Sequence, residues 1–193
     1  MTSQSLRLAI RQQRRSLPYR ETAACAEQLA LQARKHPAIL RSQRIAAYIA
    51  NDGEIDPLPL LDYLWSSGKQ VYLPVLVQFS RQKLWFARFN RNDMLAPNRF
   101  GIPEPVKRDL IKPCALELVL TPLVAFDSCG HRIGMGGGFY DRTFAFLHKR
   151  KHWCRPVMIG LAYELQKQTR IEPNKWDVPL HAVATEAQLY TTM

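Results

Sequence analysis

Residues 118–142 read LVLTPLVAFDSCGHRIGMGGGFYDR, and this stretch decides the fold. Its first half is a nearly continuous apolar run, which is typical of a strand buried on both faces of a parallel sheet. Five of the nine residues from Gly130 to Gly138 are glycine, although the whole chain has only 9 glycines. The next residues, 139–147, carry apolar side chains at helical spacing. The predicted order is therefore a buried strand, a glycine-rich loop and the start of a helix.

A loop of this composition can bind an anion. Without Cβ atoms the chain turns sharply and brings several backbone N–H groups close to one ligand, and a helix N-terminus favours negative charge. Two familiar phosphate loops do not match. A Walker loop needs Gly-Lys-Ser/Thr, whereas Gly68-Lys69 is followed by Gln70, and the dinucleotide fingerprint needs a glycine where Phe139 stands. A tight turn that binds nothing is the alternative, but three consecutive glycines would then cost conformational entropy without a use.

The composition indicates one folded domain. At 193 residues, with 47% hydrophobic residues, the chain is long enough to bury a substantial core. No apolar run reaches membrane-spanning length and the N-terminus is charged, so we expect a cytoplasmic protein with no membrane segment. The four cysteines form no Cys-x-x-Cys pair and have no histidines at zinc-ligand spacing, so reduced thiols are expected.

Hydrophobic periodicity divides the chain into alternating helices and strands. Helices are expected over residues 4–17, 18–36, 58–67 and 139–147, with Pro37 ending the second of them. Strands are expected over 44–50, 70–76, 84–89 (as an edge strand), from 118 onward, 156–161 and 182–185. Residues 91–113 are polar and proline-rich, and are expected to be a connecting excursion. The alternation predicts a single α/β domain over residues 1–193, with a mainly parallel sheet flanked by helices in a Rossmann-like three-layer arrangement.

Three carboxylates stand where either chemistry or structure could use them. Glu54 follows a turn just beyond strand 44–50, where open parallel sheets hold their ligands, but it could equally be an acid near a helix N-terminus. Asp141, beside the glycine loop, could be a Mg²⁺ ligand or a favourable first-turn charge. Asp177 could shape the turn before Pro179. The residues alone leave the alternatives for Glu54 and Asp141 open.

The chain is strongly basic. With 27 Lys and Arg against 16 Asp and Glu, its formal charge of +11 indicates an anionic partner. Nucleic acid would qualify, but there is no zinc finger, obvious helix-turn-helix or aromatic RNP-type strand, and the basic residues are spread along the chain. Arg7, Arg11 and Arg14 recur along the first helix, and for Arg11, Arg14 and Arg15 a solvated face is expected.

Several motifs, in order along nearly the whole chain, resemble the family of 5-formyltetrahydrofolate cyclo-ligases, also called 5,10-methenyltetrahydrofolate synthetases. The most specific one runs through the glycine loop, from Gly134 to Arg142, and is preceded by Pro122, Ala125-Phe126-Asp127, Gly130 and Arg132. The other matching segments are Leu6-Arg7, Asp52-Gly53-Glu54-Ile55-Asp56, Gly68-Lys69, Val71-Tyr72-Leu73-Pro74, Ile102-Pro103-Glu104-Pro105 and Trp176-Asp177-Val178-Pro179-Leu180.

The resemblance implies an enzyme that uses ATP and Mg²⁺ to close 5-formyltetrahydrofolate to 5,10-methenyltetrahydrofolate, releasing ADP and phosphate. It implies ATP binding by Arg7, Arg132, Ile133, Gly134, Met135, Gly136, Gly137, Gly138, Phe139 and Tyr140. It implies folate binding by Ile49, Glu54, Met135, Gly136, Gly137, Gly138 and Phe139, and metal binding by Asp141 and Asp177. No catalytic acid or base is identified. The family's N-terminal lysine is replaced here by Ser3.

The implied partners are ATP and 5-formyltetrahydrofolate, which can carry a polyglutamate tail, and these anions would explain the basic charge as well as nucleic acid would. We expect a monomer that binds neither nucleic acid nor membrane. Two other classes stay open from the residues: a basic nucleic-acid-binding module whose glycine loop contacts backbone phosphate, and a sugar-phosphate or CoA-handling enzyme on a similar scaffold. The latter would need a substrate-specific base or a nucleophilic glutamate, for which Glu54 is the one candidate.

Overall fold

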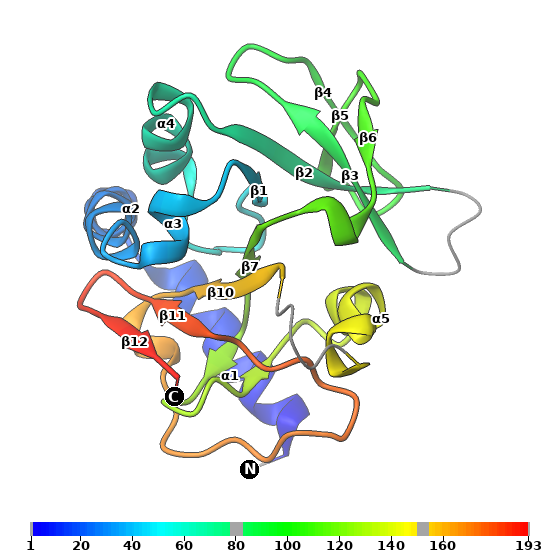
Figure 1. The fold of residues 1–193 in the computed structure, drawn as a ribbon. Helices are drawn as coiled ribbons and strands as arrows, with labels where there is room; N and C mark the ends of the chain where they lie inside the picture. Colours follow the sequence, from blue (N-terminus) through cyan, green and yellow to red (C-terminus); the bar gives the residue numbers. More distant parts are fainter. Residues whose placement is uncertain (1, 78–82, 150–154, 193) are drawn as a thin grey trace.

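Eight strands form one twisted sheet, in the order β12-β11-β10-β7-β1-β2-β3-β6 (Figure 1). In this computed structural model, residues 2–77, 83–149 and 155–192 are described. The five central strands are parallel: β11 (Ala182–Ala184), β10 (Val157–Leu161), β7 (Leu118–Pro122), β1 (Arg44–Ala46) and β2 (Gln70–Leu76). Antiparallel strands flank them, with β12 (Leu189–Thr191) at one end and β3 (Leu84–Phe89) and β6 (Leu110–Ile111) at the other.

Helices cover both faces of this sheet, which confirms the predicted three-layer α/β architecture. Figure 1 shows α2 (Tyr19–Ala33), α3 (Pro37–Arg41) and α4 (Leu58–Ser66) on one side, and α5 (Phe139–Phe144) on the other. The first layer contributes Leu29, Ile39 and Leu61 to one core cluster, whereas α5 contributes Phe144 to the other. Three 3₁₀ turns complete the helical segments: η1 (Pro113–Ala115), η2 (Ala145–Lys149) and η3 (Glu164–Gln166).

The first helix, α1 (Ser3–Ser16), packs elsewhere. It buries Ile10 against Val124, Ala125 and Ile171, in a third apolar cluster beyond the ends of the central strands. Next to it, β8 (Ala125–Phe126) and β9 (Arg132–Ile133) form a short hairpin. The buried Asp127 holds the hairpin turn, because its carboxylate accepts from the backbone N–H groups of Cys129, His131 and Ile171 at 2.9–3.0 Å.

The strand order contains one reversal. Among the parallel strands, the chain passes from β1 to β2 on one side and then returns to β7 on the other side of β1. Ligands of open α/β sheets bind at such a reversal, outside the carboxyl ends of the two strands. Here the turn at Asp52 follows β1, and the hairpin with the glycine loop follows β7. The fold therefore brings the two segments that the sequence singled out to the same edge of the sheet.

Several predicted boundaries were wrong. Pro37 does not simply end a helix, since it occupies the first turn of α3, where its missing N–H needs no partner. Strand β1 has three residues instead of seven, because the chain leaves the sheet at the reversal. Strand β3 is not an edge strand, because β6 pairs with it on the outer side. Strand β12 was not predicted at all.

The proline-rich excursion over residues 91–113 contains more structure than predicted. Besides β6, it forms a ribbon of β4 (Leu95–Pro97) and β5 (Pro103–Pro105). The buried Glu104 fastens this ribbon to the sheet, because its carboxylate accepts from the Leu76 N–H at 2.9 Å and from Arg108 at 2.9 Å. The sequence did not predict these strands because of their prolines, since proline lacks the backbone N–H donor that a strand interior requires.

Replacing Gly130 by alanine should destabilise the fold strongly. Gly130 has φ +82°, and an added Cβ would lie 2.4 Å from the Leu180 carbonyl oxygen. Gly68→Ala is the matched control, because Gly68 has φ +72° but no atom within 4 Å of the added Cβ. Backbone strain alone costs about 1 kcal/mol, and overpacking adds about 1–3 kcal/mol. Urea denaturation should therefore rank the variants clearly, and an equal loss in both would contradict the close contact.

Candidate active site

The glycine loop runs from Gly134 to Gly138, between β9 and α5. Gly136 and Gly138 have positive φ values of +95° and +59°, so glycine is needed there for backbone conformation. A Cβ added at Gly134 or Gly136 would meet no atom within 4 Å. No backbone N–H from Gly134 to Gly138 donates to a protein acceptor among the residues that the structure describes. The loop therefore offers open space and a run of available backbone donors.

Arginine side chains hold the loop by its carbonyl groups. Arg7 Nε of α1 donates to the Gly134 oxygen at 2.8 Å, and Arg142 of α5 donates to the Gly137 oxygen. These contacts fix the carbonyls and bring positive charge to the same segment. A negative ligand at the loop would meet both the arginine charge and the backbone N–H groups. Two predicted residues, Arg7 and Gly134, are thus in direct contact although 127 positions separate them.

A second arginine contact joins the loop region to Asp141. Arg132 has a side chain that is only 6% exposed, and it donates to Asp141 Oδ1 at 2.5 Å and to the Val178 oxygen. The Val178 N–H also donates to Asp141 Oδ1, at 3.1 Å. Asp141 is therefore tied to the segment that contains Asp177. Arg132 neutralises a carboxylate in this arrangement instead of extending freely toward the loop.

Asp177 has a structural use as well as a possible ligand role. Its Oδ2 accepts from the backbone N–H of Asn174 at 2.8 Å and from the Asn174 side chain at 3.2 Å. No group of three or more His, Cys, Asp or Glu side chains with metal-binding geometry occurs in the described parts of the chain. Asp141 and Asp177 are joined through Val178, so a Mg²⁺ ion there would take its other ligands from phosphate and water.

Glu54 lies in the turn that follows β1, on the other side of the strand reversal. Its Oε2 accepts from the Asn51 N–H at 3.1 Å, and its own N–H donates to the Asn51 oxygen at 3.0 Å. Burial raises the pKa of Glu54 from 4.5 to about 7, against the opposing influence of the Asn51 hydrogen bond and the Arg14 charge. Near neutral pH this carboxyl group can therefore either donate or accept a proton.

The two halves of the site are electrostatically coupled. The pKa of Tyr140, in the first turn of α5, is raised by burial and by the negative charge of Glu54. Ile49, also half-buried, comes just before the Glu54 turn and packs against the core on the α2 side of the sheet. Ile133 packs with the α1 cluster, and Met135 is exposed in the loop. The predicted residues thus gather around the strand reversal, apart from Asp177, which joins them through Val178.

Aromatic rings border the loop. The Phe139 and Phe100 rings meet edge to face, with centroids 6.1 Å apart, although Phe100 belongs to the turn between β4 and β5. Phe100 is 54% exposed, so its ring has a free surface beside the loop. The β4–β5 ribbon, where the sequence predicts only a connecting segment, therefore contributes a flat apolar surface to the candidate site.

The predicted solvated face of α1 was wrong for Arg14, whereas Arg15 is exposed as predicted. Arg14 is completely buried, and it donates to the Leu123 oxygen at 3.1 Å and to the Asp52 oxygen at 3.0 Å. Arg11 Nε and Arg15 Nε bind the two carboxylate oxygens of Asp52 at 2.6 and 2.5 Å. Arginines spaced three and four apart do lie along one side of a helix, and here that side packs against the Asp52 turn, so that Arg14 is buried while Arg15 stays at the surface. The periodicity gave no sign of this carboxylate partner.

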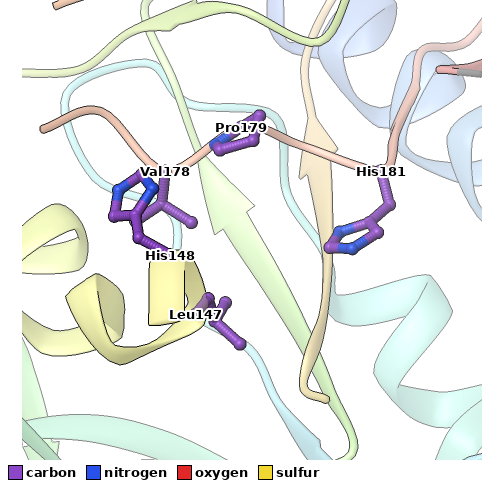
Figure 2. A pocket seen from close by; sticks show the side chains of 5 residues that line it. All are labelled: Leu147, His148, Val178, Pro179 and His181. Carbon is purple, nitrogen blue, oxygen red and sulfur yellow. The ribbon is translucent and has the colours of Figure 1, made fainter. Parts of the chain in front are cut away.

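A cavity of about 130 Å³ adjoins the Asp141 side of the site. Figure 2 shows Leu147 and His148 of η2 facing Val178, Pro179 and His181 across it. The His181 Nδ1 accepts from the Met158 N–H at 3.0 Å, and burial lowers the pKa of this imidazole. The histidine therefore stays neutral near pH 7, and the lining is mainly apolar. Except for the Val178 and Pro179 segment, the sequence analysis did not point to this cavity.

Comparison with known proteins gives one consistent result. Residues 1–186 match the model of the 5-formyltetrahydrofolate cyclo-ligase family. The chain is 38% identical to the 5-formyltetrahydrofolate cyclo-ligase of Escherichia coli (strain K12), over 94% of this chain and 98% of that protein. It is 38% identical to the enzyme of that name from Haemophilus influenzae, over 92% and 94%. The NMR structure of Aquifex aeolicus 5,10-methenyltetrahydrofolate synthetase superposes with a TM-score of 0.81 at 28% identity, over 99% of this chain and 93% of that one.

Glu54→Gln should stabilise the fold near pH 8 and change its stability little near pH 4. The pKa of Glu54 is raised to about 7, so the folded state binds this proton more tightly than the unfolded chain does. The stability contributed by the neutral carboxyl group is present below pH 4.5 and is lost as the pH rises through 7. Glutamine carries no charge and escapes this loss. Urea denaturation at both pH values tests this, and an identical difference at each would rule out the raised pKa.

Proposed function

The chain belongs to the 5-formyltetrahydrofolate cyclo-ligase family, and on that premise we propose that it catalyses the ATP- and Mg²⁺-dependent cyclisation of 5-formyltetrahydrofolate. The products are 5,10-methenyltetrahydrofolate, ADP and phosphate. One observation supports this assignment above all: the open glycine loop and the Glu54 turn meet at the strand reversal, where one ligand can be brought to another. We further propose that residues 1–193 act as one cyclo-ligase unit.

The reaction explains why ATP is needed. The formyl group on N5 is an amide-like carbon and therefore a poor electrophile, and water is a poor leaving group from the ring-closed adduct. Transfer of the γ-phosphoryl group to the formyl oxygen solves both problems. N10 of the folate then attacks the activated carbon, its proton is lost, and the phosphate leaves as the methenyl bridge closes. The protein has to align the formyl oxygen with the γ-phosphate and exclude water.

The glycine loop is the proposed phosphate site. Its backbone N–H groups can donate to the phosphate oxygens and stabilise the charge of the transferring group. The proposed ATP contacts are Arg7, Arg132, Ile133, Gly134, Met135, Gly136, Gly137, Gly138, Phe139 and Tyr140. Arg7 supports this role through its contact with the Gly134 oxygen, and its charge stays close to the loop. Ser3, at the start of α1, supplies no charge where the family resemblance implies a lysine.

The folate is proposed to lie between the glycine loop and the Glu54 turn. Ile49 offers an apolar contact, and Glu54 can hydrogen-bond a pterin N–H when ionised or a pterin nitrogen when protonated. The loop residues from Met135 to Phe139 would contact both ligands. The exposed Phe100 ring, packed against Phe139, would add a surface for a flat ring. Glu54 also becomes a candidate acceptor for the N10 proton, since its pKa is close to neutral.

Asp141 and Asp177 are the proposed Mg²⁺ ligands. Carboxylates held together near a phosphate site are the usual protein ligands of Mg²⁺, and these two are linked through the Val178 backbone. A bound Mg²⁺ would neutralise charge on the β- and γ-phosphates. In the arrangement described, Arg132 balances the charge of Asp141. We also propose that ATP and the folate, with or without a polyglutamate tail, are the natural partners instead of nucleic acid.

A cytoplasmic location and a monomeric state remain proposals. In the parts of the chain that the structure covers, no helix is long and apolar enough to cross a membrane. Cys25, Cys114 and Cys129 are free thiols, as expected, while Cys154 lies outside the described residues. Free thiols are typical of proteins that work in reducing compartments.

Turnover by the purified protein tests the proposed function directly. Protein, ATP, Mg²⁺ and 5-formyltetrahydrofolate should together produce the near-ultraviolet absorbance of the methenyl product. Omitting ATP should abolish the signal, and chelating Mg²⁺ should do the same. Phosphate release should match methenyl formation one to one. Product without ATP, or ATP hydrolysis that does not depend on the folate, would refute the proposal.

Gly134→Val should abolish most turnover without unfolding the protein. No atom lies within 4 Å of an added Cβ at Gly134 and its φ is not positive, so the side chain would project into open space without strain. If phosphate occupies that space, kcat/KM should fall by about a hundredfold, as for loss of one transition-state donor. Gly137→Val is less clean, since its Cβ would lie 3.0 Å from the Phe139 ring.

The control for Gly134→Val is Ala145→Val, which places the same valine side chain at an exposed position just after α5. Both variants should keep their melting temperatures within about 4 °C of the wild type, the shift that roughly 1 kcal/mol produces in a chain of this size. Unchanged activity in a folded Gly134→Val variant would show that phosphate does not bind against this loop.

A further inference from the structure

Helix α1 touches both halves of the candidate site through two arginines on one side of the helix. Arg7 and Arg14 are seven residues apart, which is two helical turns, or about 10 Å along the axis. Arg7 contacts the glycine loop at the Gly134 oxygen. Arg14 contacts the other half, where its two terminal nitrogens donate to the Leu123 and Asp52 oxygens. One rigid helix therefore spans the strand reversal.

The two shorter Arg14 contacts are to backbone carbonyls on the two sides of the reversal, and its Nη2 also lies 3.5 Å from Asp52 Oδ2. Leu123 comes directly after β7, and Asp52 lies in the turn after β1. The guanidinium group thus joins the residue that directly follows β7 to the turn that follows β1. A planar fork with several fixed donors suits such a bridge, whereas a lysine ammonium on a flexible stem does not.

The burial of the charged Arg14 side chain lowers the stability of the fold. Its side chain is 0% exposed, burial lowers the pKa of the guanidinium, and its Nε has no hydrogen-bond partner in the described part of the chain. A buried donor left unsatisfied typically costs about 1–3 kcal/mol. Replacing buried charged groups by apolar residues is often neutral or stabilising. The position of this charge thus calls for a role besides stabilising the fold.

The turn that Arg14 holds is strained and closely packed. Asp52 has φ +53°, which is uncommon for a residue other than glycine. A Cβ on the neighbouring Gly53 would lie 3.2 Å from the Arg14 carbonyl carbon, so the turn lies directly against the α1 backbone. The next residue is Glu54, whose carboxyl group caps the same turn at Asn51. A displacement of this turn would therefore move Glu54 with it.

We infer that Arg14 is a positioning residue for the reaction: by tying the Asp52 turn to the end of β7, it sets where the Glu54 carboxyl group stands relative to the glycine loop. This inference rests on the proposed role of Glu54 in folate binding. Arg14 itself touches neither ligand and acts through the turn. Without the Arg14 contacts, the Glu54 side of the folate site would no longer be held in place relative to the glycine loop.

Arg14 also belongs to the small set of charges and titratable groups around Glu54. From α1 the positive charge of Arg14 lowers the pKa of Glu54, while Asp52 in the turn raises it. Tyr140 of α5 and Tyr48, in the segment after β1, are electrostatically coupled to the same carboxyl group: burial raises the pKa of both tyrosines, and the negative charge of Glu54 raises it further. Loss of the Arg14 charge should thus move the titration of Glu54 to higher pH.

The test compares Arg14→Met, Arg14→Lys and Arg15→Gln. Arg14→Met removes both the bridge and the charge, so KM for 5-formyltetrahydrofolate should rise by about tenfold, the loss expected for one buried charged hydrogen-bond pair. KM for ATP should stay within about twofold of the wild-type value. The Glu54 carboxyl resonance, followed by ¹³C NMR without ligands, should titrate at higher pH. Arg14→Lys keeps the charge, so its Glu54 titration should resemble the wild type while its folate KM is intermediate.

Arg15→Gln is the matched control, because Arg15 binds the same Asp52 carboxylate from the surface but, among the described residues, donates to no backbone carbonyl. It should leave both KM values and the Glu54 titration unchanged. A folded Arg14→Met variant with wild-type folate KM would overturn the inference, as would equal effects of Arg15→Gln. If both Arg14 variants fail to fold, Arg14 is a folding residue and the inference is wrong. Failure of the proposed function is separate: the wild type itself would then form no methenyl product.

Discussion

The reversal of strand order between β1 and β7 is the constraint on which the rest of the structure depends. From β1 the chain proceeds to β2 on one side, and from β7 it proceeds to β10 and β11 on the other side, so the connections diverge at this pair of strands and leave room beyond their carboxyl ends. Glu54 and the glycine loop owe their proximity to this divergence, since Glu54 and Gly134 are 80 positions apart in the sequence. Helix α1 then lies across the opening and joins its two sides with arginine side chains.

Arginine contacts give the site a consistent polarity. They take up carbonyl oxygens of the loop and of the Asp52 turn, so negative backbone dipoles are turned toward protein cations while N–H groups remain for a ligand. The basic residues thus have two uses: some arginine side chains pair inside the protein with carbonyl oxygens and with Asp52 and Asp141, and the other positive charges are available to attract an anion. Composition alone could not separate these two groups.

The sequence was sufficient for the parts of the fold that local pattern determines. The apolar run at β7, the glycine cluster and the alternation of helices and strands predicted the layered α/β architecture and the segments that form the site. Contacts between distant segments were not predictable. Arg14 has the same periodicity as an exposed arginine, and its buried position depends on Asp52, which is 38 positions away. Likewise β12 and the β4–β5 ribbon are short or interrupted by proline, so their pairing partners, not their own residues, make them strands.

The two ends of the sheet have a consequence for how the molecule meets its own copies. β6 has two residues and β12 has three, so each outermost strand offers only a few unpaired backbone groups. Strand addition from a neighbour needs a longer, straighter template, and very short outer strands are one of the means by which β-proteins escape aggregation. The five parallel strands lie between these short outer strands, and most of their side chains are buried. Once folded, copies of this protein would therefore have little tendency to associate through their sheet edges, even at high concentration.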